Sequence, residues 1–209
     1  MTMLQRPPQP LPPYQHGGFL KQPNLTSSVD NQEYLTECAE LIGEHKIEID
    51  EEKILDLLQI KYRWPEQSLE VINHCGMVSN DFFDVKGYLI YDRWKRLYDL
   101  GFTSLLNNVL DLTSQLRDLN NKLLAIKGSE TNANFYLSKG TETRRPSFDP
   151  HNHDYHVVVK PIYGSCTWVV NGKKHEAVED SVLVIPAFSE HSVISNKEPR
   201  LSLTINLTG

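Results

Sequence analysis

Hydrophobic residues in the N-terminal part of the chain recur at helical spacing. Leu35, Cys38 and Leu41 would share one face of a helix, and the run from Ile54 to Leu58 would form the apolar side of a second. Asp50 stands where its carboxylate can cap the second helix, and two glutamates follow it. We therefore predict a helical region over residues 31–86.

A mixed segment follows this helical region. Residues 87–91 and 102–106 are short, apolar and contain aromatic side chains, so they predict strands, with one short helix between them. Leu116, Leu119 and Leu123 fall on one helical stripe that Thr113 or Ser114 can cap. This pattern predicts a well-defined helix over residues 113–126.

From Asn132 onward, the pattern becomes that of short strands separated by turn residues. The predicted strands cover residues 133–137, 151–160, 166–171, 175–178, 182–185, 192–195 and 201–207. Asn171-Gly172 is the signature of a two-residue hairpin turn. Seven short strands with regular turns predict a mainly β fold, with a jelly-roll barrel over residues 87–209 after the helical region (α+β overall).

Composition limits what the chain can do. The first 30 residues are rich in Pro, Gln, Gly and Ser, so we predict a flexible arm that buries little surface. A net charge of −6 gives no broad electrostatic attraction to nucleic acid, and no apolar run is long enough to cross a membrane. Three scattered cysteines indicate reduced thiols in a cytoplasmic protein. A homodimer is compatible with the sequence, although no motif requires one.

Three histidines in the barrel region have the spacing of a metal site. His151 and His153 are two residues apart, so on one strand their imidazoles would point to the same face. His191 follows an apolar strand and a proline, and it can complete the set from a facing strand. Imidazole suits Fe, Zn, Cu and Ni, and three protein ligands leave positions free for substrate. The spacing therefore predicts a catalytic metal rather than a closed structural site.

The motifs around these histidines resemble the JmjC-type cupin family. The resemblance rests on residues 133–138, 148–157, 181–186 and 191–193, and on Gly164 and Trp168. Members of that family are Fe(II)- and 2-oxoglutarate-dependent oxygenases with a double-stranded β-helix. The resemblance implies the same fold, metal and cosubstrate for roughly residues 87–208, and it does not cover the N-terminal helices.

The family pattern identifies His151 and His191 as metal ligands, but it has a carboxylate where this chain has His153. A neutral imidazole in place of an anion leaves the metal site one charge more positive. This departure leaves open a different metal, or an oxidase that does not use 2-oxoglutarate. Asp154 could supply a carboxylate only if a bulge turned it inward, and His156 has the same orientation problem.

The resemblance also implies a cosubstrate pocket. Asn134 and Tyr136 match an asparagine and a tyrosine that line this pocket from the first barrel strand. Arg200 and Ser202 resemble an Arg-x-Ser arrangement that binds the distal carboxylate of 2-oxoglutarate, a task for which the guanidinium fork is well shaped.

Other roles stay open for these residues. Tyr136 could be a core aromatic, and Arg200 could pair with Glu198 at the surface. Many family members carry the basic residue near the position of Cys166, where this chain has none. Lys160 is a second basic candidate, although strand alternation should point it away from His151.

We therefore predict an Fe(II)-dependent oxygenase that hydroxylates a small molecule or a protein side chain, with 2-oxoglutarate as cosubstrate. Arg144 and Arg145, in the loop before His151, could contact an anionic substrate or be solvated. Two alternatives stay open. One is a three-histidine cupin dioxygenase that binds its substrate directly on the metal, similar to the thiol dioxygenases. The other is a non-catalytic cupin module that binds zinc or no metal.

Overall fold

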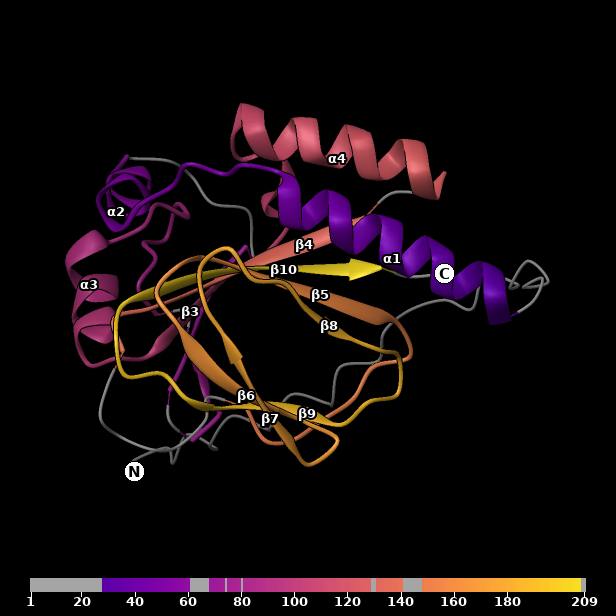
Figure 1. Cartoon of the computed structure of the whole chain (residues 1–209). Helices are drawn as coiled ribbons and strands as arrows, with labels where there is room; N and C mark the ends of the chain where they lie inside the picture. The colour runs from indigo at the N-terminus through magenta and orange to yellow at the C-terminus, as the bar shows by residue number, and fades with distance from the viewer. Residues whose placement is uncertain are drawn as a thin grey trace, which may run out of the picture.

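A computed structural model describes residues 28–60, 68–73, 75–79, 81–128, 131–140 and 148–207 of the chain. Two antiparallel sheets face each other and form a jelly-roll barrel, and helices cover the outer face of the larger sheet (Figure 1). The mainly β fold with an N-terminal helical region is therefore confirmed. Residues 1–27 of the predicted arm, as well as Arg144 and Arg145, lie outside the described residues.

The larger sheet has seven strands in the order β2-β1-β3-β4-β10-β5-β8, and the smaller has three in the order β7-β6-β9. The first sheet comprises β1 (Leu69–Ile72), β2 (Val78–Ser79), β3 (Thr103–Leu106), β4 (Asn132–Ser138), β5 (His156–Tyr163), β8 (Leu183–Ile185) and β10 (Arg200–Leu207). The second comprises β6 (Cys166–Val170), β7 (Lys173–Ala177) and β9 (His191–Ser195). Asn171 and Gly172 join β6 to β7 with positive φ angles of 47° and 77°, as the hairpin signal predicts.

Two of the helices begin where the sequence provides a capping side chain. The helices are α1 (Ser28–Glu44), α2 (Glu51–Gln59), α3 (Tyr91–Asp99) and α4 (Ser114–Lys127), with a short 3-10 turn, η1 (Val109–Asp111). The Asp50 side chain accepts the Lys53 N–H at the start of α2, and the Thr113 side chain accepts the Leu116 N–H at the start of α4. Among the described residues, no helix is long and apolar enough to cross a membrane.

Two local predictions are wrong. The region predicted as helical also contains β1 and β2, which extend the larger sheet beyond β3, and segments this short carry no clear periodicity. Residues 87–91, predicted as a strand, make only an isolated bridge between Leu89 and Phe83. The Asp84 side chain accepts the N–H groups of Lys86 and Tyr88, which favours a turn there, and α3 begins directly afterwards.

Strand alternation divides the larger sheet into a helix-facing side and a lumen-facing side. On β10, Leu201, Leu203 and Ile205 are buried in the core that includes residues of α1 and α4. The alternate positions of β10 lie on the opposite face. Three of them line the barrel cavity, namely Arg200, Thr204 and Asn206, whereas Ser202 does not. The two faces therefore separate the hydrophobic core from the candidate site.

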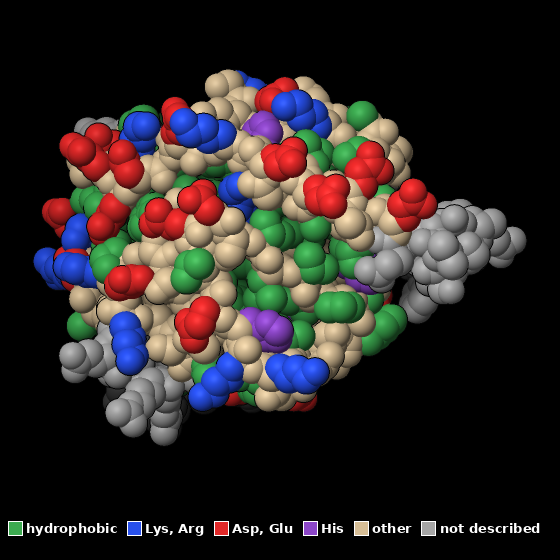
Figure 2. All heavy atoms as spheres, viewed as in Figure 1, with side chains coloured by type: hydrophobic (Ala, Val, Ile, Leu, Met, Phe, Trp, Pro, Cys, Tyr) green, Lys and Arg blue, Asp and Glu red, His purple; other side chains and the backbone are tan. Residues whose placement is uncertain are grey.

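The exposed face of helix α1 is acidic (Figure 2). Helix α1 presents four exposed glutamates, namely Glu33, Glu37, Glu40 and Glu44. Its C-terminal end is fixed to the barrel by Lys160, whose buried ammonium donates to the carbonyl oxygens of Ile42 (2.9 Å) and Gly43 (2.6 Å). A cation here also suits the negative end of the helix dipole. Lys160 thus points away from the histidines, as alternation predicts.

Replacing Lys160 with Met should destabilise the protein, because two buried carbonyl groups lose a charged donor while most of the side-chain volume remains. We expect the free energy of unfolding to fall by about 2 kcal/mol, measured by urea denaturation. Lys173→Met, on exposed β7, is the matched control and should change it by less than about 0.5 kcal/mol. Equal effects of the two substitutions would show that the Lys160 contact is unimportant.

Candidate metal centre

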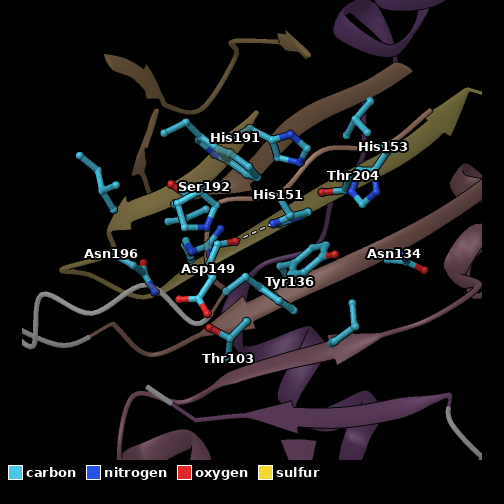
Figure 3. A pocket seen from close by; sticks show the side chains of 18 of the residues that line it. Thr103, Asn134, Tyr136, Asp149, His151, His153, His191, Ser192, Asn196 and Thr204 are labelled. Carbon is cyan, nitrogen blue, oxygen red and sulfur yellow. Dashed lines mark hydrogen bonds between the residues drawn. The ribbon is translucent and has the colours of Figure 1, made fainter. Parts of the chain in front are cut away.

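Three imidazoles converge at one end of the barrel. One ligand nitrogen from each of His151, His153 and His191 lies within 4.8 Å of the others. Their ring centroids are 4.5 to 5.2 Å apart. Figure 3 shows the three rings turned toward one another above Tyr136. The histidine set predicted from spacing therefore comes together in space.

The backbone that brings them together differs from the predicted one. The strand predicted over residues 151–160 begins only at His156. His151 instead forms an isolated bridge with His191, in which each N–H donates to the other's carbonyl, at 3.1 and 2.8 Å. His153 is outside any strand, and its carbonyl accepts the Phe188 N–H. The chain crosses from the smaller sheet to the larger one here, which ends the regular alternation.

Two of the three rings are held by hydrogen bonds that define their tautomer. Nδ1 of His151 lies 2.8 Å from the Asp149 carbonyl oxygen, and Nδ1 of His191 lies 2.8 Å from the Ser189 carbonyl oxygen. A carbonyl oxygen can only accept, so each Nδ1 carries the proton, and Nε2 keeps its lone pair for a metal. His153 is held differently, with its ring stacked on Tyr155 at 4.6 Å and 7°.

The environment favours the neutral form of His153 and His191. Burial, together with the neighbouring imidazoles of His151 and His191, lowers the pKa of His153 from 6.5 to about 4. Burial also lowers the pKa of His191, against the opposing effect of its bond to Ser189. Neutral imidazoles are the form that binds metal, so these groups are ready to act as ligands near pH 7. Three imidazoles without a closing fourth ligand fit a catalytic divalent metal of the iron, zinc, copper or nickel type.

The histidines line a cavity of about 450 Å³, large enough for a small organic ligand. Aromatic side chains form much of its wall, namely Tyr136, Phe148, Tyr155 and Trp168. Several polar atoms that line it are buried and have no hydrogen-bond partner: Trp168 Nε1, Asn196 Oδ1, Arg200 Nε and Thr204 Oγ1. Buried polar groups in proteins are nearly always paired, so this set indicates a cavity that receives a polar ligand.

Arg200 is the buried cation of this cavity. Only 4% of its surface is exposed, and its Nη1 donates to Ser202 Oγ (3.2 Å) and contacts Cys166 Sγ (3.5 Å). Glu198, the alternative surface partner, instead accepts a hydrogen bond from Ser165. Among the described residues, no carboxylate lies within ion-pair distance of Arg200. A buried guanidinium without a counter-ion favours an anionic ligand.

The contact with Cys166 places the Arg200 guanidinium beside the position where the JmjC resemblance predicts a basic residue. The resemblance expects a lysine or arginine near residue 166, and the Arg200 guanidinium reaches this place from β10. Gly164, at a φ of 70°, makes room for the approach, because an added Cβ would lie 2.1 Å from the Pro199 carbonyl oxygen. Ser202 orients Arg200 and is not itself part of the cavity lining.

Asn134 and Tyr136 both line the cavity from β4. Burial raises the pKa of Tyr136 to about 12, so its hydroxyl stays protonated and can donate to a ligand. Asn134 Oδ1 already accepts the Asn108 N–H at 3.2 Å, which fixes its orientation. Two other candidates lie outside the histidine cluster: Asp154 is exposed, and His156 accepts the Ala187 N–H.

Several residues that line the cavity were not predicted from the sequence. Thr204 and Asn206 lie on the same alternate positions of β10 as Arg200, so strand parity could have identified them. Asn196 and Phe148 lie in connecting segments, where no periodicity shows which way a side chain points.

Comparison with known proteins agrees with a cupin-type barrel. Residues 138–206 match the family model described as an AraC-like ligand binding domain, and this segment includes all three histidines and Arg200. No curated protein matches the chain. JmjC-type specificity therefore stays a prediction from the motifs.

Solved structures that resemble part of the chain include cupins and an enzyme. A cupin superfamily protein from Desulfitobacterium hafniense is 16% identical over 38% of this chain and 68% of that chain, with a TM-score of 0.33. An RmlC-like cupin from Shewanella frigidimarina is 11% identical over 38% and 67%, with a TM-score of 0.32. The DMSP lyase DddQ from Ruegeria pomeroyi is 11% identical over 37% and 38%, with a TM-score of 0.33.

The metal-free protein should lose stability as the pH falls from about 6.5 toward 4. Folding lowers the pKa of His153, His191 and His156, so in this range the unfolded chain binds more protons than the folded one. Urea unfolding at pH 7.5 and pH 5 measures the loss. His153→Asn should reduce this loss, whereas His175→Asn, at an exposed position of β7, should leave it unchanged. A wild-type stability that is equal at the two pH values would contradict the assignment.

Proposed function

We propose that this protein is an Fe(II)-dependent oxygenase that uses 2-oxoglutarate to hydroxylate a small molecule or a protein side chain. The observation that carries the proposal is that one cavity contains both the three imidazoles and a buried arginine that has no counter-ion among the described residues. His151, His153 and His191 would hold the metal, and Arg200 would bind the distal carboxylate of the cosubstrate.

The charges in the cavity support a dianionic cosubstrate. Three neutral imidazoles leave the charge of a divalent metal uncompensated, and Arg200 adds a further positive charge. Asp149 is the one acidic side chain among the described residues that line the cavity, and it is exposed. The two carboxylates of 2-oxoglutarate would neutralise two of these three positive charges, and the replacement of the family's carboxylate by His153 increases the need for such an anion.

When bound, Fe(II) supplies the activation of O₂ that drives the reaction, in which 2-oxoglutarate, O₂ and a C–H group yield succinate, CO₂ and a C–OH group. The chain positions the reactants. The carbonyls of Asp149 and Ser189 orient two of the ligand rings, and Ser202 holds the Arg200 guanidinium. The aromatic wall, including Tyr136 and Trp168, limits the access of water.

Arg200→Met should weaken 2-oxoglutarate binding by roughly 100-fold, or about 3 kcal/mol, because a buried carboxylate would lose its charged partner. Calorimetric titration of the Fe(II)-loaded protein without oxygen measures this change. Fe(II) affinity itself should change by less than about threefold, since Arg200 is not a ligand. Ser202→Ala is a milder matched change and should cost about 1 kcal/mol. Unchanged 2-oxoglutarate binding in Arg200→Met would remove Arg200 from the site.

Among the residues that the structure describes, the histidine cluster contains no carboxylate, and this favours one second candidate. In that case the protein is a three-histidine oxygenase whose anionic substrate binds directly to the metal, with Arg200 as its counter-ion. The two functions differ in their use of the cosubstrate. Conversion of 2-oxoglutarate to succinate by the Fe(II)-loaded protein supports the first proposal. If the protein consumes oxygen in the presence of a small acid and does so without 2-oxoglutarate, the result supports the second candidate.

A further inference from the structure

We propose that His156 is a positioning residue for the metal centre and acts through the loop of residues 186–190, an inference that rests on the metal site proposed above. His156 is not among the three converging histidines. Its ring instead connects the first residue of β5 to the loop that precedes β9. That loop touches two of the three candidate ligands.

The connection begins at a rigid point. His156 pairs with Leu207 of β10 in the larger sheet, and its side chain is partly buried. Its Nδ1 accepts the Ala187 N–H at 3.1 Å. To accept this bond, Nδ1 must be unprotonated, so the ring is the neutral Nε2–H tautomer. The sheet thereby determines where the loop backbone lies at residue 187.

The next two residues of the loop reach the ligands. The Phe188 N–H donates to the His153 carbonyl oxygen at 2.6 Å. The Ser189 carbonyl oxygen accepts from His191 Nδ1 at 2.8 Å, which sets both the orientation and the tautomer of that ligand. One short segment therefore fixes the backbone of one ligand and the ring of another.

The conformation of this loop needs external support. Phe188 has a φ of 62°, a left-handed conformation that is unfavourable for a residue with a side chain, and its own side chain is 73% exposed. Hydrogen bonds on both sides hold the strained turn. His156 holds it on one side, and Asn171 on the other accepts the Glu190 N–H at 3.0 Å and donates to Ser189 Oγ at 3.1 Å. Strain that persists only where its surroundings enforce it is typical of functional sites.

The test separates the acceptor at Nδ1 from the bulk of the ring. His156→Asn places an amide oxygen near the position of Nδ1, whereas His156→Gln places it near Nε2. We expect His156→Gln to lower Co(II) affinity at least tenfold and to alter the visible absorption of the bound Co(II). His156→Asn should stay within about threefold of the wild type and keep its spectrum. Circular dichroism and the urea midpoint check that each variant is folded.

Asn171→Gly provides a second variant in case His156→Gln does not fold. Glycine suits the φ of 47° at this turn and removes only the side chain that holds the loop. We expect it also to lower Co(II) affinity. If the wild type binds Co(II) and neither His156→Gln nor Asn171→Gly lowers its affinity or alters its spectrum, the inference is wrong. Equal losses in His156→Asn and His156→Gln would also overturn it. A wild-type protein that does not bind Co(II) would instead refute the proposed metal site.

Discussion

Two backbone hydrogen bonds between His151 and His191 determine the geometry of the candidate site. They join the segment before β5, a strand of the larger sheet, to the first residue of β9 in the smaller sheet. The barrel is thereby closed at the place where both residues present their imidazoles. His153 follows two residues later, on backbone fixed by Phe188. The metal site is thus a consequence of how the two sheets meet, and it does not depend on a regular strand carrying His-x-His.

The same barrel also positions Arg200, the buried cation of the candidate site. Because side chains alternate along β10, every other residue from Arg200 faces the lumen, while the leucines between them support the helices. Arg200 is consequently buried beside Cys166 and Ser202, and no carboxylate in the described part of the chain pairs with it. A buried charge of this kind is costly for a protein unless a ligand neutralises it. In the proposed function, the distal carboxylate of 2-oxoglutarate neutralises the buried guanidinium.

Much of this arrangement could be predicted from the sequence. The caps at Asp50 and Thr113, the hairpin at Asn171-Gly172 and the barrel strands all rest on local rules of periodicity and turn chemistry, and the structure contains them. The three histidines come together as predicted, although His151 and His153 do not lie on the single regular strand that their spacing indicates. The start of β5 could not be predicted, because a crossover between sheets depends on long-range pairing.

The burial of Arg200 also could not be predicted from the sequence. The local sequence was equally compatible with an Arg200 that lines the pocket and with an Arg200 that pairs with Glu198 at the surface. Only the approach of β10 to residues 164–166 decides between these two positions. The support that His156 gives to the loop of residues 186–190 is also non-local, since it joins residues 31 positions apart. Periodicity identifies which side chains share a face, but it does not show which loops those side chains hold.

The central claim is that three imidazoles and one anionic cosubstrate meet at a single metal. Iron K-edge X-ray absorption of the Fe(II)-loaded protein, recorded without oxygen in the presence and absence of 2-oxoglutarate, tests it most directly. The account predicts three imidazole ligands per iron, and additional oxygen ligands when 2-oxoglutarate is added. Fewer than three imidazoles per iron, or a ligand set that does not change on addition of 2-oxoglutarate, would contradict it.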